Sequence, residues 1–262
     1  MAGADKIRIR FRPEKYREFR KEIRKFLRNT RGFEVMDESE NYVELICLSN
    51  ASEMPLSASI NRMYLQLASL VRDIVSVLEG DDLDLISDAE ERESEVDALL
   101  YLVERQVCVA LDSHLVATSL KLGRNQAVEH SNLARSLERM MDHALQMAEL
   151  SKESDNPKDA DNQPLVSQIS VWQRAIKQLM INIRTRDSTE IEEARGNLKQ
   201  AQIEIMNFEG QLVEGRKLSK SDLFQFRMSE SIRRLCAYAR DFGEILLNIK
   251  MYDEMIIDKS ND

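Results

Sequence analysis

Residues 136–149 read SLERMMDHALQMAE, and their apolar side chains recur at the three- and four-residue spacing of an α-helix. Within this stretch Glu138 and Asp142 stand four positions apart, so they share one face of the predicted helix. Two carboxylates at that spacing repel each other unless a cation or a basic side chain lies between them. The stretch therefore predicts a helical fold and a candidate cation site together.

A second acidic pair, Glu93 and Asp97, has the same spacing on an earlier predicted helix. Hard cations bind several carboxylate oxygens at once, so two acidic helix faces turned toward each other would form a metal site. We therefore predict metal ligands at Glu93, Asp97, Glu138 and Asp142. The alternative is a solvated helix face, because the chain has 46 Asp and Glu residues and such pairs often arise by chance.

Residues 231–244 repeat the pattern of residues 136–149 at a fixed offset of 95. Ser, Arg, Ala and Glu coincide in the two stretches, and the apolar positions match. This self-similarity predicts an internal duplication. The two acids are not repeated, because Arg233 and Ala237 occupy the equivalent positions. We therefore expect metal in the first copy alone.

The helical periodicity predicts a mainly α fold with two duplicated three-helix bundles, preceded by a small β-α-β-β module. The predicted boundaries are 1–50 for the module, 55–150 for the first bundle, 151–164 for a polar linker and 165–258 for the second bundle. The second helix of the first bundle is expected from Leu83 to Leu111, and the third from about Ser131. Two capping patterns, Thr189 with Glu192 and Ser219 with Asp222, are expected to open helices of the second bundle.

The front of the chain has a different charge from the rest. Residues 6–31 contain twelve Lys or Arg and three Glu, a local balance of +9, which leaves −18 for the remainder. Ile7, Ile9 and Phe11 alternate with arginines as in a strand, and Pro13 then opens a helix. Gly32 can end that helix in a left-handed conformation, and two further strands follow, over 33–38 and 42–48.

Composition favours a helical protein of a reducing compartment. Only 8 Gly and 4 Pro interrupt the 262 residues. Cys47, Cys108 and Cys236 are scattered without CxxC spacing, so we interpret them as thiols and not as a disulfide framework. We find no apolar run of the length that a membrane helix needs and no signal-peptide pattern, so we predict a cytoplasmic protein that is not membrane-embedded.

The sequence contains no motif that is typical of an enzyme active site. The three histidines, His114, His130 and His143, form no HxxxH or HExxH arrangement, and no Gly-rich phosphate loop is present. A ferritin-like di-iron oxidase would require Glu-x-x-His pairs, whereas Met141 follows Glu138 and Val96 follows Glu93 at that spacing. We therefore predict a non-enzymatic protein in which His143 forms hydrogen bonds on or between helices.

These motifs together resemble those of a known protein family. Glu138-Arg-Met-Met-Asp-His-Ala144 resembles the E-R-I-G-D-H-A signature of PhoU, the phosphate-signalling regulator, whose fold is two three-helix bundles related by duplication. Residues 93–106 and the segment 32–38 are similar to stretches of archaeal-type PhoU relatives. Many of those relatives begin with an AbrB-like DNA-binding domain, which has no equivalent ahead of Lys6. We therefore do not expect direct transcription-factor activity.

The resemblance implies a function and its partners. It implies a negative regulator of phosphate uptake and phosphate homeostasis that contacts a phosphate transporter or its signalling partner. Family members bind iron, zinc or other divalent ions such as magnesium through E/D-x-x-x-D motifs, and only Glu93, Asp97, Glu138 and Asp142 match these motifs here.

Two further expectations concern assembly and partners. We expect a homodimer, because long amphipathic helices often leave an apolar stripe to cover. The alternative function is a nucleic-acid or anionic-surface binding module that uses the basic front section. The acidic remainder of the chain would repel nucleic acid, so we do not expect nucleic acid to be the partner.

Overall fold

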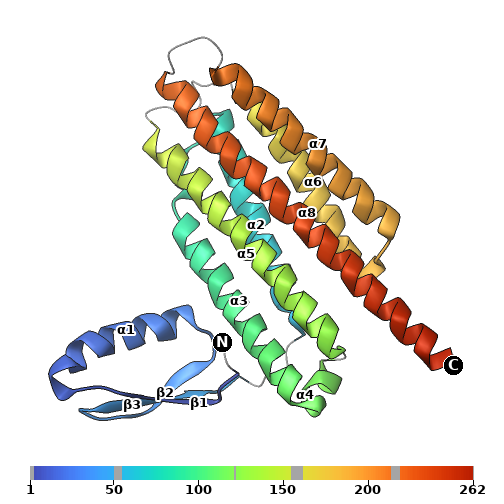
Figure 1. Cartoon of the computed structure of the whole chain (residues 1–262). Helices are drawn as coiled ribbons and strands as arrows, with labels where there is room; N and C mark the ends of the chain where they lie inside the picture. The colour runs from blue at the N-terminus through green and yellow to red at the C-terminus, as the bar shows by residue number, and fades with distance from the viewer. Residues whose placement is uncertain (1–2, 50–54, 121, 155–161, 214–218, 262) are drawn as a thin grey trace. The chain divides into compact units, whose positions relative to one another are not determined.

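The computed structural model describes residues 3–49, 55–120, 122–154, 162–213 and 219–261, and side-chain burial up to residue 255. Its elements are an N-terminal three-stranded sheet and a set of long helices that follow it in the chain (Figure 1). The prediction of a β-α-β-β module followed by helical bundles is therefore confirmed. Among the described residues, no helix is both long enough and apolar enough to cross a membrane.

The front module is a small antiparallel sheet with one covering helix. Its strands are β1 (Lys6–Arg10), β2 (Phe33–Glu38) and β3 (Tyr42–Cys47), arranged in the order β1-β3-β2. Lys6 pairs with Ile46 and Phe33 with Cys47, and a register shift interrupts β2 between Val35 and Asp37. Because side chains alternate across a strand, Ile7 and Ile9 lie on one face of β1, and Arg8 and Arg10 on the other.

The helix of the module buries one apolar face against the sheet. A 3₁₀ turn, η1 (Pro13–Lys15), leads into α1 (Tyr16–Asn29). Ile23 of α1 is buried in a cluster of apolar residues, against which Phe19, Phe26 and Leu27 also pack. The other buried members of the cluster are Phe11, Phe33, Val43 and Leu45. Gly32 follows the helix at a φ of 84°, as expected for a residue that turns the chain into β2.

In the described part of the chain, seven helices and one 3₁₀ segment follow the sheet. They are α2 (Leu56–Glu79), η2 (Leu83–Ile86), α3 (Ala89–Asp112), α4 (His114–Ser119), α5 (Arg124–Glu153), α6 (Gln163–Thr185), α7 (Ser188–Val213) and α8 (Lys220–Asn261). The helix expected from Leu83 is interrupted, because the Asp82 side chain accepts a hydrogen bond from the Asp84 N–H at 3.0 Å and starts a separate short segment. The next long helix begins at Arg124, seven residues earlier than expected.

Contacts divide the chain into two compact units. The first unit comprises Met1–Ile60 and Ser94–Ser131, and the second comprises Asn61–Glu93 and Asn132–Asp262. The division passes through α2, α3 and α5, since each of these three helices contributes residues to both units. The predicted domain boundaries and the superposition of the two predicted bundles stay predictions. The predicted linker, residues 151–164, overlaps the end of α5, which runs to Glu153, and the start of α6 at Gln163. Residues 155–161 of it are outside the described residues.

Within the second unit, α6, α7 and α8 pack against one another as a three-helix bundle. Trp172 of α6 and Phe242 of α8 are fully buried in it, together with Leu198 of α7. One capping expectation is confirmed at the start of α8, because the Asp222 N–H donates to Ser219 Oγ at 3.1 Å and the Ser219 N–H donates to the Asp222 carboxylate at 2.8 Å. The other is wrong. Asp187, and not Thr189, caps α7 by accepting hydrogen bonds from the N–H groups of Thr189 and Glu190.

Buried positions support the predicted duplication. At the offset of 95 residues, six positions of α5 and their counterparts in α8 are all buried. These pairs are Leu137 and Ile232, Met140 and Leu235, Met141 and Cys236, Ala144 and Ala239, Met147 and Phe242, and Ala148 and Gly243. The two helices therefore turn the same face of the repeat inward, which is the relation that a duplicated bundle requires.

Candidate functional site

The acidic pairs predicted as metal ligands lie on α3 and α5. Glu93 and Asp97 are partly buried near the start of α3. Glu138 is partly buried and Asp142 is exposed, one turn apart on α5. Glu93, Glu138 and Asp142 belong to the second compact unit, whereas Asp97 belongs to the first.

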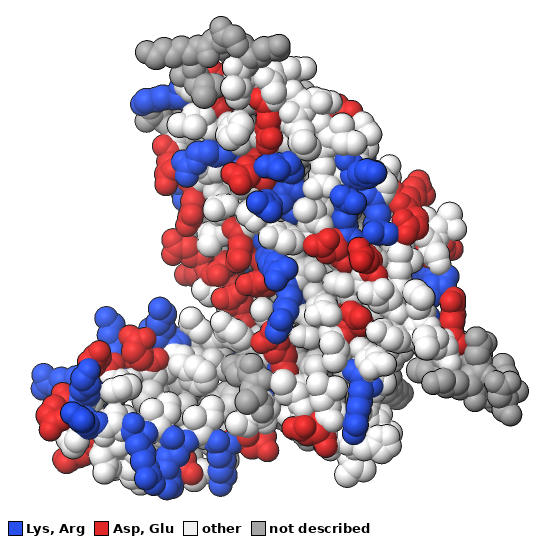
Figure 2. All heavy atoms as spheres, viewed as in Figure 1, with Lys and Arg blue, Asp and Glu red and all other residues white. Residues whose placement is uncertain are grey.

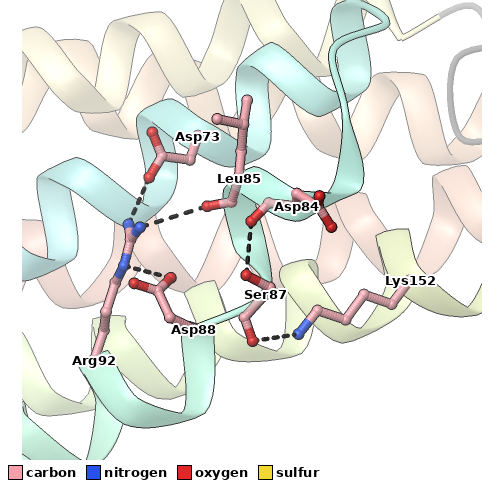
Figure 3. Close-up of polar contacts among 7 residues, drawn as sticks. All are labelled: Asp73, Asp84, Leu85, Ser87, Asp88, Arg92 and Lys152. Carbon is pink, nitrogen blue, oxygen red and sulfur yellow. Dashed lines mark hydrogen bonds and ion pairs between the residues drawn. The ribbon is translucent and has the colours of Figure 1, made fainter.

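The start of α3 is held by a charged network around Arg92, which precedes Glu93 (Figure 3). The Arg92 guanidinium donates to the Asp73 carboxylate of α2 at 2.5 Å and pairs with Asp88 at 2.8 Å. It also contacts the backbone oxygen of Leu85 at 3.4 Å. Burial lowers the pKa of Arg92, but the hydrogen bonds that it donates to Asp88 and Asp73 outweigh burial and raise the pKa overall. The network therefore fixes the first turn of α3 against α2 with a guanidinium that stays charged.

The connection between α2 and α3 is fixed by further polar contacts. Ser87 Oγ donates to the backbone oxygen of Asp84 at 2.7 Å, and Lys152 near the end of α5 donates to the backbone oxygen of Ser87 at 3.4 Å (Figure 3). Asn162, at the start of α6, donates from Nδ2 to the backbone oxygen of Leu78 at 3.2 Å. Side chains from α5 and the start of α6 thus donate hydrogen bonds to backbone oxygens at the end of α2 and in the connection.

One face of α5 packs on α8. The His143 ring stacks on Tyr238 with ring centroids 5.8 Å apart, and the Arg139 guanidinium lies 5.6 Å from the centre of the same ring. Gln146 joins the two helices as well, because its Oε1 contacts His143 Nδ1 at 3.1 Å and accepts from Ser231 Oγ at 3.3 Å. The prediction that His143 has a hydrogen-bonding role is confirmed.

The acids of α5 lie on a different side of that helix from His143. Residues 142 and 143 project about 100° apart around a helix axis, so Asp142 does not share the face that stacks on Tyr238. Although Asp142 is an exposed residue, the surrounding helix partly desolvates its carboxyl group, which raises its pKa, and the neighbouring His143 opposes this shift. Burial also lowers the pKa of His143, against the effect of its hydrogen bond with Gln146. The two groups therefore each favour their neutral forms more than free side chains do.

The four predicted ligands do not resemble a ready-made metal site. Among the described residues, no three His, Cys, Asp or Glu side chains are grouped so that they could hold one ion. Glu93, Asp97 and Glu138 each already take part in a polar interaction, so a cation would have to displace those interactions. As placed, these carboxylates are not a preassembled ligand set, and metal binding at the four positions stays a prediction.

The second bundle departs from the acidic pattern, as the alignment at an offset of 95 predicts. Arg233, the counterpart of Glu138, pairs with Glu209 of α7 at 3.6 Å. Glu209 also accepts a hydrogen bond from Ser229 at 2.9 Å. The counterpart of Asp142 is Ala237, which has no ligand atom. An arginine in an ion pair within α7 and α8 is structural, and it would repel a cation.

Two features were missed by the analysis of the sequence. The first is the buried Arg105 of α3, whose guanidinium donates to the Asp5 carboxylate just before β1. The second is a groove along α1 lined by Tyr16, Arg17, Arg20, Lys21, Arg24 and Arg28. The +9 balance of residues 6–31 indicated that this region is basic. The spacing of Arg17, Lys21, Arg24 and Arg28, which places them on one side of a helix, is the signal that could have located the groove.

Comparison with known families identifies one domain. The model of the PhoU domain matches residues 60–151, which include both acidic pairs and the stretch from Glu138 to Ala144. A search of curated proteins finds no significant match.

Proposed function

We propose that this chain, a PhoU-family protein by its domain at residues 60–151, is a non-enzymatic regulator that restrains phosphate uptake through protein–protein contact. The domain match carries the proposal, because PhoU domains belong to regulators of phosphate homeostasis. The partner in this proposal is a phosphate transporter or its signalling protein, reached from the cytoplasm. The long helices of the domain supply extended faces suited to such a contact.

The exposed face of α5 is the part of the domain that we assign to the partner. Asp142 and Glu149 are exposed and seven residues apart, so they lie on one side of α5, away from the side that stacks on Tyr238. Charges at the rim of an interface mainly set the rate and specificity of association. Reversing both charges should therefore weaken the contact without disturbing the buried residues between α5 and α8.

The experiment measures phosphate uptake in cells that lack the gene and are complemented with variants. We expect the deletion to raise uptake at high phosphate and the wild-type chain to restore restraint. Asp142→Lys with Glu149→Lys should fail to restore it. The matched control is Glu193→Lys with Asp241→Lys, which makes the same charge change at exposed positions outside residues 60–151. Unchanged uptake on deletion of the gene would refute the function, and loss of restraint in the control would refute the assignment to α5.

We place the proposed homodimer contact on α7. Ile203, Met206 and Val213 are exposed by 42%, 57% and 52%, and with Gly210 they recur at spacings of three and four residues. A Cβ added at Gly210 would meet nothing within 4 Å, so this glycine in the last turn of α7 has no packing role among the described residues. A hollow of about 680 Å³ lies along the same stretch.

The charge of this stripe favours a second copy of the chain as its occupant. The four positions of the stripe are uncharged, and Asn207 and Gln211 beside it are neutral. Lys199, one turn before Ile203, and Glu209, three residues after Met206, carry opposite charges. Most of the chain is strongly acidic, so two copies meet with least repulsion at a neutral face. Light scattering should give a dimer that Ile203→Glu with Met206→Glu converts to the 30.3 kDa monomer. Leu223→Glu with Met251→Glu, at exposed positions of α8, should remain dimeric.

A further inference from the structure

A row of basic side chains runs along the outer face of α1. Arg17, Lys21, Arg24 and Arg28 follow one another at spacings of four, three and four residues, so they lie on one side of the helix. All four are exposed, while Ile23 on the opposite side is buried against the sheet. From the first to the last of these bases, the row extends about 16 Å along the helix axis. Figure 2 shows Lys and Arg side chains gathered over the segment that α1 and the sheet form.

The row lines a groove in which two further side chains are held in place by contacts with β2. The groove has a volume of about 450 Å³, and Tyr16 and Arg20 complete its lining. Arg20 pairs with Glu38 of β2 at 3.2 Å and lies 5.6 Å from the centre of the Tyr16 ring. The Tyr16 hydroxyl donates to the same carboxylate at 2.8 Å. Arg20 and Tyr16 are therefore oriented by β2, and the outer four bases remain directed to the groove.

The four outer bases concentrate positive charge that the described residues do not neutralise. In the part of the chain that the structure describes, none of Arg17, Lys21, Arg24 and Arg28 forms an ion pair. Like charges three and four residues apart on a helix repel each other. A bound polyanion would remove this repulsion, which gives the groove a preference for a ligand with several linked negative groups.

We propose that the α1 groove binds linear inorganic polyphosphate. Guanidinium groups match phosphate oxygens in bidentate geometry, and Lys21 adds a point charge within the row. A single phosphate ion could meet only one or two of the four bases, whereas a chain of phosphates can follow the whole row. Displacement of counterions from both partners then drives binding.

The same geometry argues against a nucleic acid strand. Proteins that bind single strands offer aromatic faces on which bases stack. The phenylalanine rings of α1 are used inside the module, because Phe19 stacks on Phe11 at 5.4 Å and Phe26 meets Phe33 edge-on at 5.7 Å. Tyr16 is the one aromatic residue among the described residues that line the groove, and it is already engaged by Phe11, Arg20 and Glu38. The groove therefore presents mainly basic groups for phosphates and no unengaged ring for a base.

The geometry also argues against a lipid bilayer. Helices that lie in a membrane interface insert large apolar side chains. None of the exposed large apolar side chains among the residues described lies on α1. A ligand recognised through phosphates alone, without bases or acyl chains, fits the groove best.

The test titrates the full chain against end-labelled long-chain polyphosphate by fluorescence anisotropy. Arg17→Gln, Lys21→Gln, Arg24→Gln and Arg28→Gln are combined in one variant. The control combines Arg174→Gln, Lys177→Gln, Arg184→Gln and Lys199→Gln, which removes the same charge from exposed positions of α6 and α7. Circular dichroism should show unchanged helix content in both, because Gln is a good helix former and all eight side chains are exposed.

We expect the α1 variant to bind polyphosphate at least about tenfold more weakly than the wild type, and the slope of log K against log salt to fall by roughly three. The control should keep the wild-type affinity to within about twofold. Equal affinity of wild type and α1 variant would overturn the proposal. So would tighter binding of single-stranded DNA of equal charge, or of phosphatidylglycerol vesicles, because either result would assign the groove to another ligand.

Discussion

Arg105, buried on α3, donates a hydrogen bond to the carboxylate of Asp5, one hundred residues earlier in the chain. The Arg105 side chain is 4% exposed, whereas that of Asp5 is 80% exposed. A second pair, Arg31 with Glu95 at 3.0 Å, also joins the front module to α3. Both pairs lie within the first compact unit, so the sheet and most of α3 belong to one cooperative part of the molecule.

Removing Asp5 should destabilise this unit. Asp5→Ala leaves the buried Arg105 guanidinium without its acceptor, and we expect the free energy of unfolding to fall by about 1 to 2 kcal/mol. Asp5→Asn, which keeps an acceptor oxygen, should cost less. Urea unfolding followed by circular dichroism measures the change, with Lys6→Ala as the neighbouring exposed control. A wild-type midpoint for Asp5→Ala would show that water replaces the carboxylate.

Arg92→Gln should loosen the junction of α2 and α3. The side chains of Arg92 and Asp73 are only 17% and 23% exposed, so their pair is less screened than a surface pair. We expect a loss of about 1 to 2 kcal/mol in urea unfolding, since a partly buried carboxylate loses a charged hydrogen bond. Glu91→Gln, at the exposed neighbouring position, should change stability little. Equal midpoints for the two variants would contradict the role given to Arg92.

His143 should make stability depend on pH. Burial lowers its pKa below the ordinary 6.5, so between the two values the unfolded chain binds more protons. Its contribution is therefore fully present above pH 6.5 and is lost as the pH falls through the folded-state pKa. His143→Phe keeps a ring against Tyr238 but cannot titrate, so the melting temperature of this variant should rise less than that of the wild type between acidic and neutral pH.

Asp142 serves as a control for that experiment, because its pKa shift makes stability depend on pH in the opposite direction. Burial raises its pKa above 3.8, so its contribution is present below that pH and is lost as the pH rises through the folded-state pKa. Asp142→Asn should therefore gain stability relative to the wild type on the alkaline side of this window. If His143→Phe and the wild type show parallel melting temperatures across the whole range, the burial of His143 has no effect on its proton affinity.

The three cysteines should differ in reactivity. Cys236 is buried on α8, and burial raises the pKa of its thiol to about 12, so almost no thiolate is present at neutral pH. Among the described residues, Cys47 and Cys108 form no disulfide, and both are partly exposed. Iodoacetamide followed by peptide mass spectrometry should label these two in the native protein and Cys236 only after unfolding. Native labelling of Cys236 at a similar rate would show that α8 opens readily.

Metal content tests the acidic pairs. We expect protein purified without chelator to carry metal that Glu138→Gln with Asp142→Asn removes, as elemental analysis would measure. Because Glu93 and Glu138 already have polar partners, the affinity should be lower than that of a preassembled site and should fall further at acidic pH, where protons compete for the ligands. The matched control is Glu193→Gln with Asp241→Asn. Equal metal in wild type and the α5 variant would refute the prediction.

The sequence by itself determined the order and type of the elements, because these depend on local pattern. Alternation of Ile7, Ile9 and Phe11 with arginines places β1, and the apolar period of residues 136–149 places α5. The offset of 95 identified positions that are buried in both α5 and α8, since burial follows helical period. The choice between two possible capping residues was harder to predict. Asp187 caps α7 because it immediately precedes the first residue, Ser188, whereas Thr189 already lies inside the helix.

Only the tertiary structure decided which residues meet across long separations. Asp5 and Arg105 are one hundred positions apart, and no local rule predicts that a buried guanidinium on α3 takes its acceptor from the residue before β1. The acidic pairs show the same limit. Spacing places Glu138 beside Asp142 on one helix, but whether carboxylates of different helices converge depends on the rotation of each helix about its axis. That rotation is set by the packing of buried side chains such as Met140 and Met141, and not by the charges themselves.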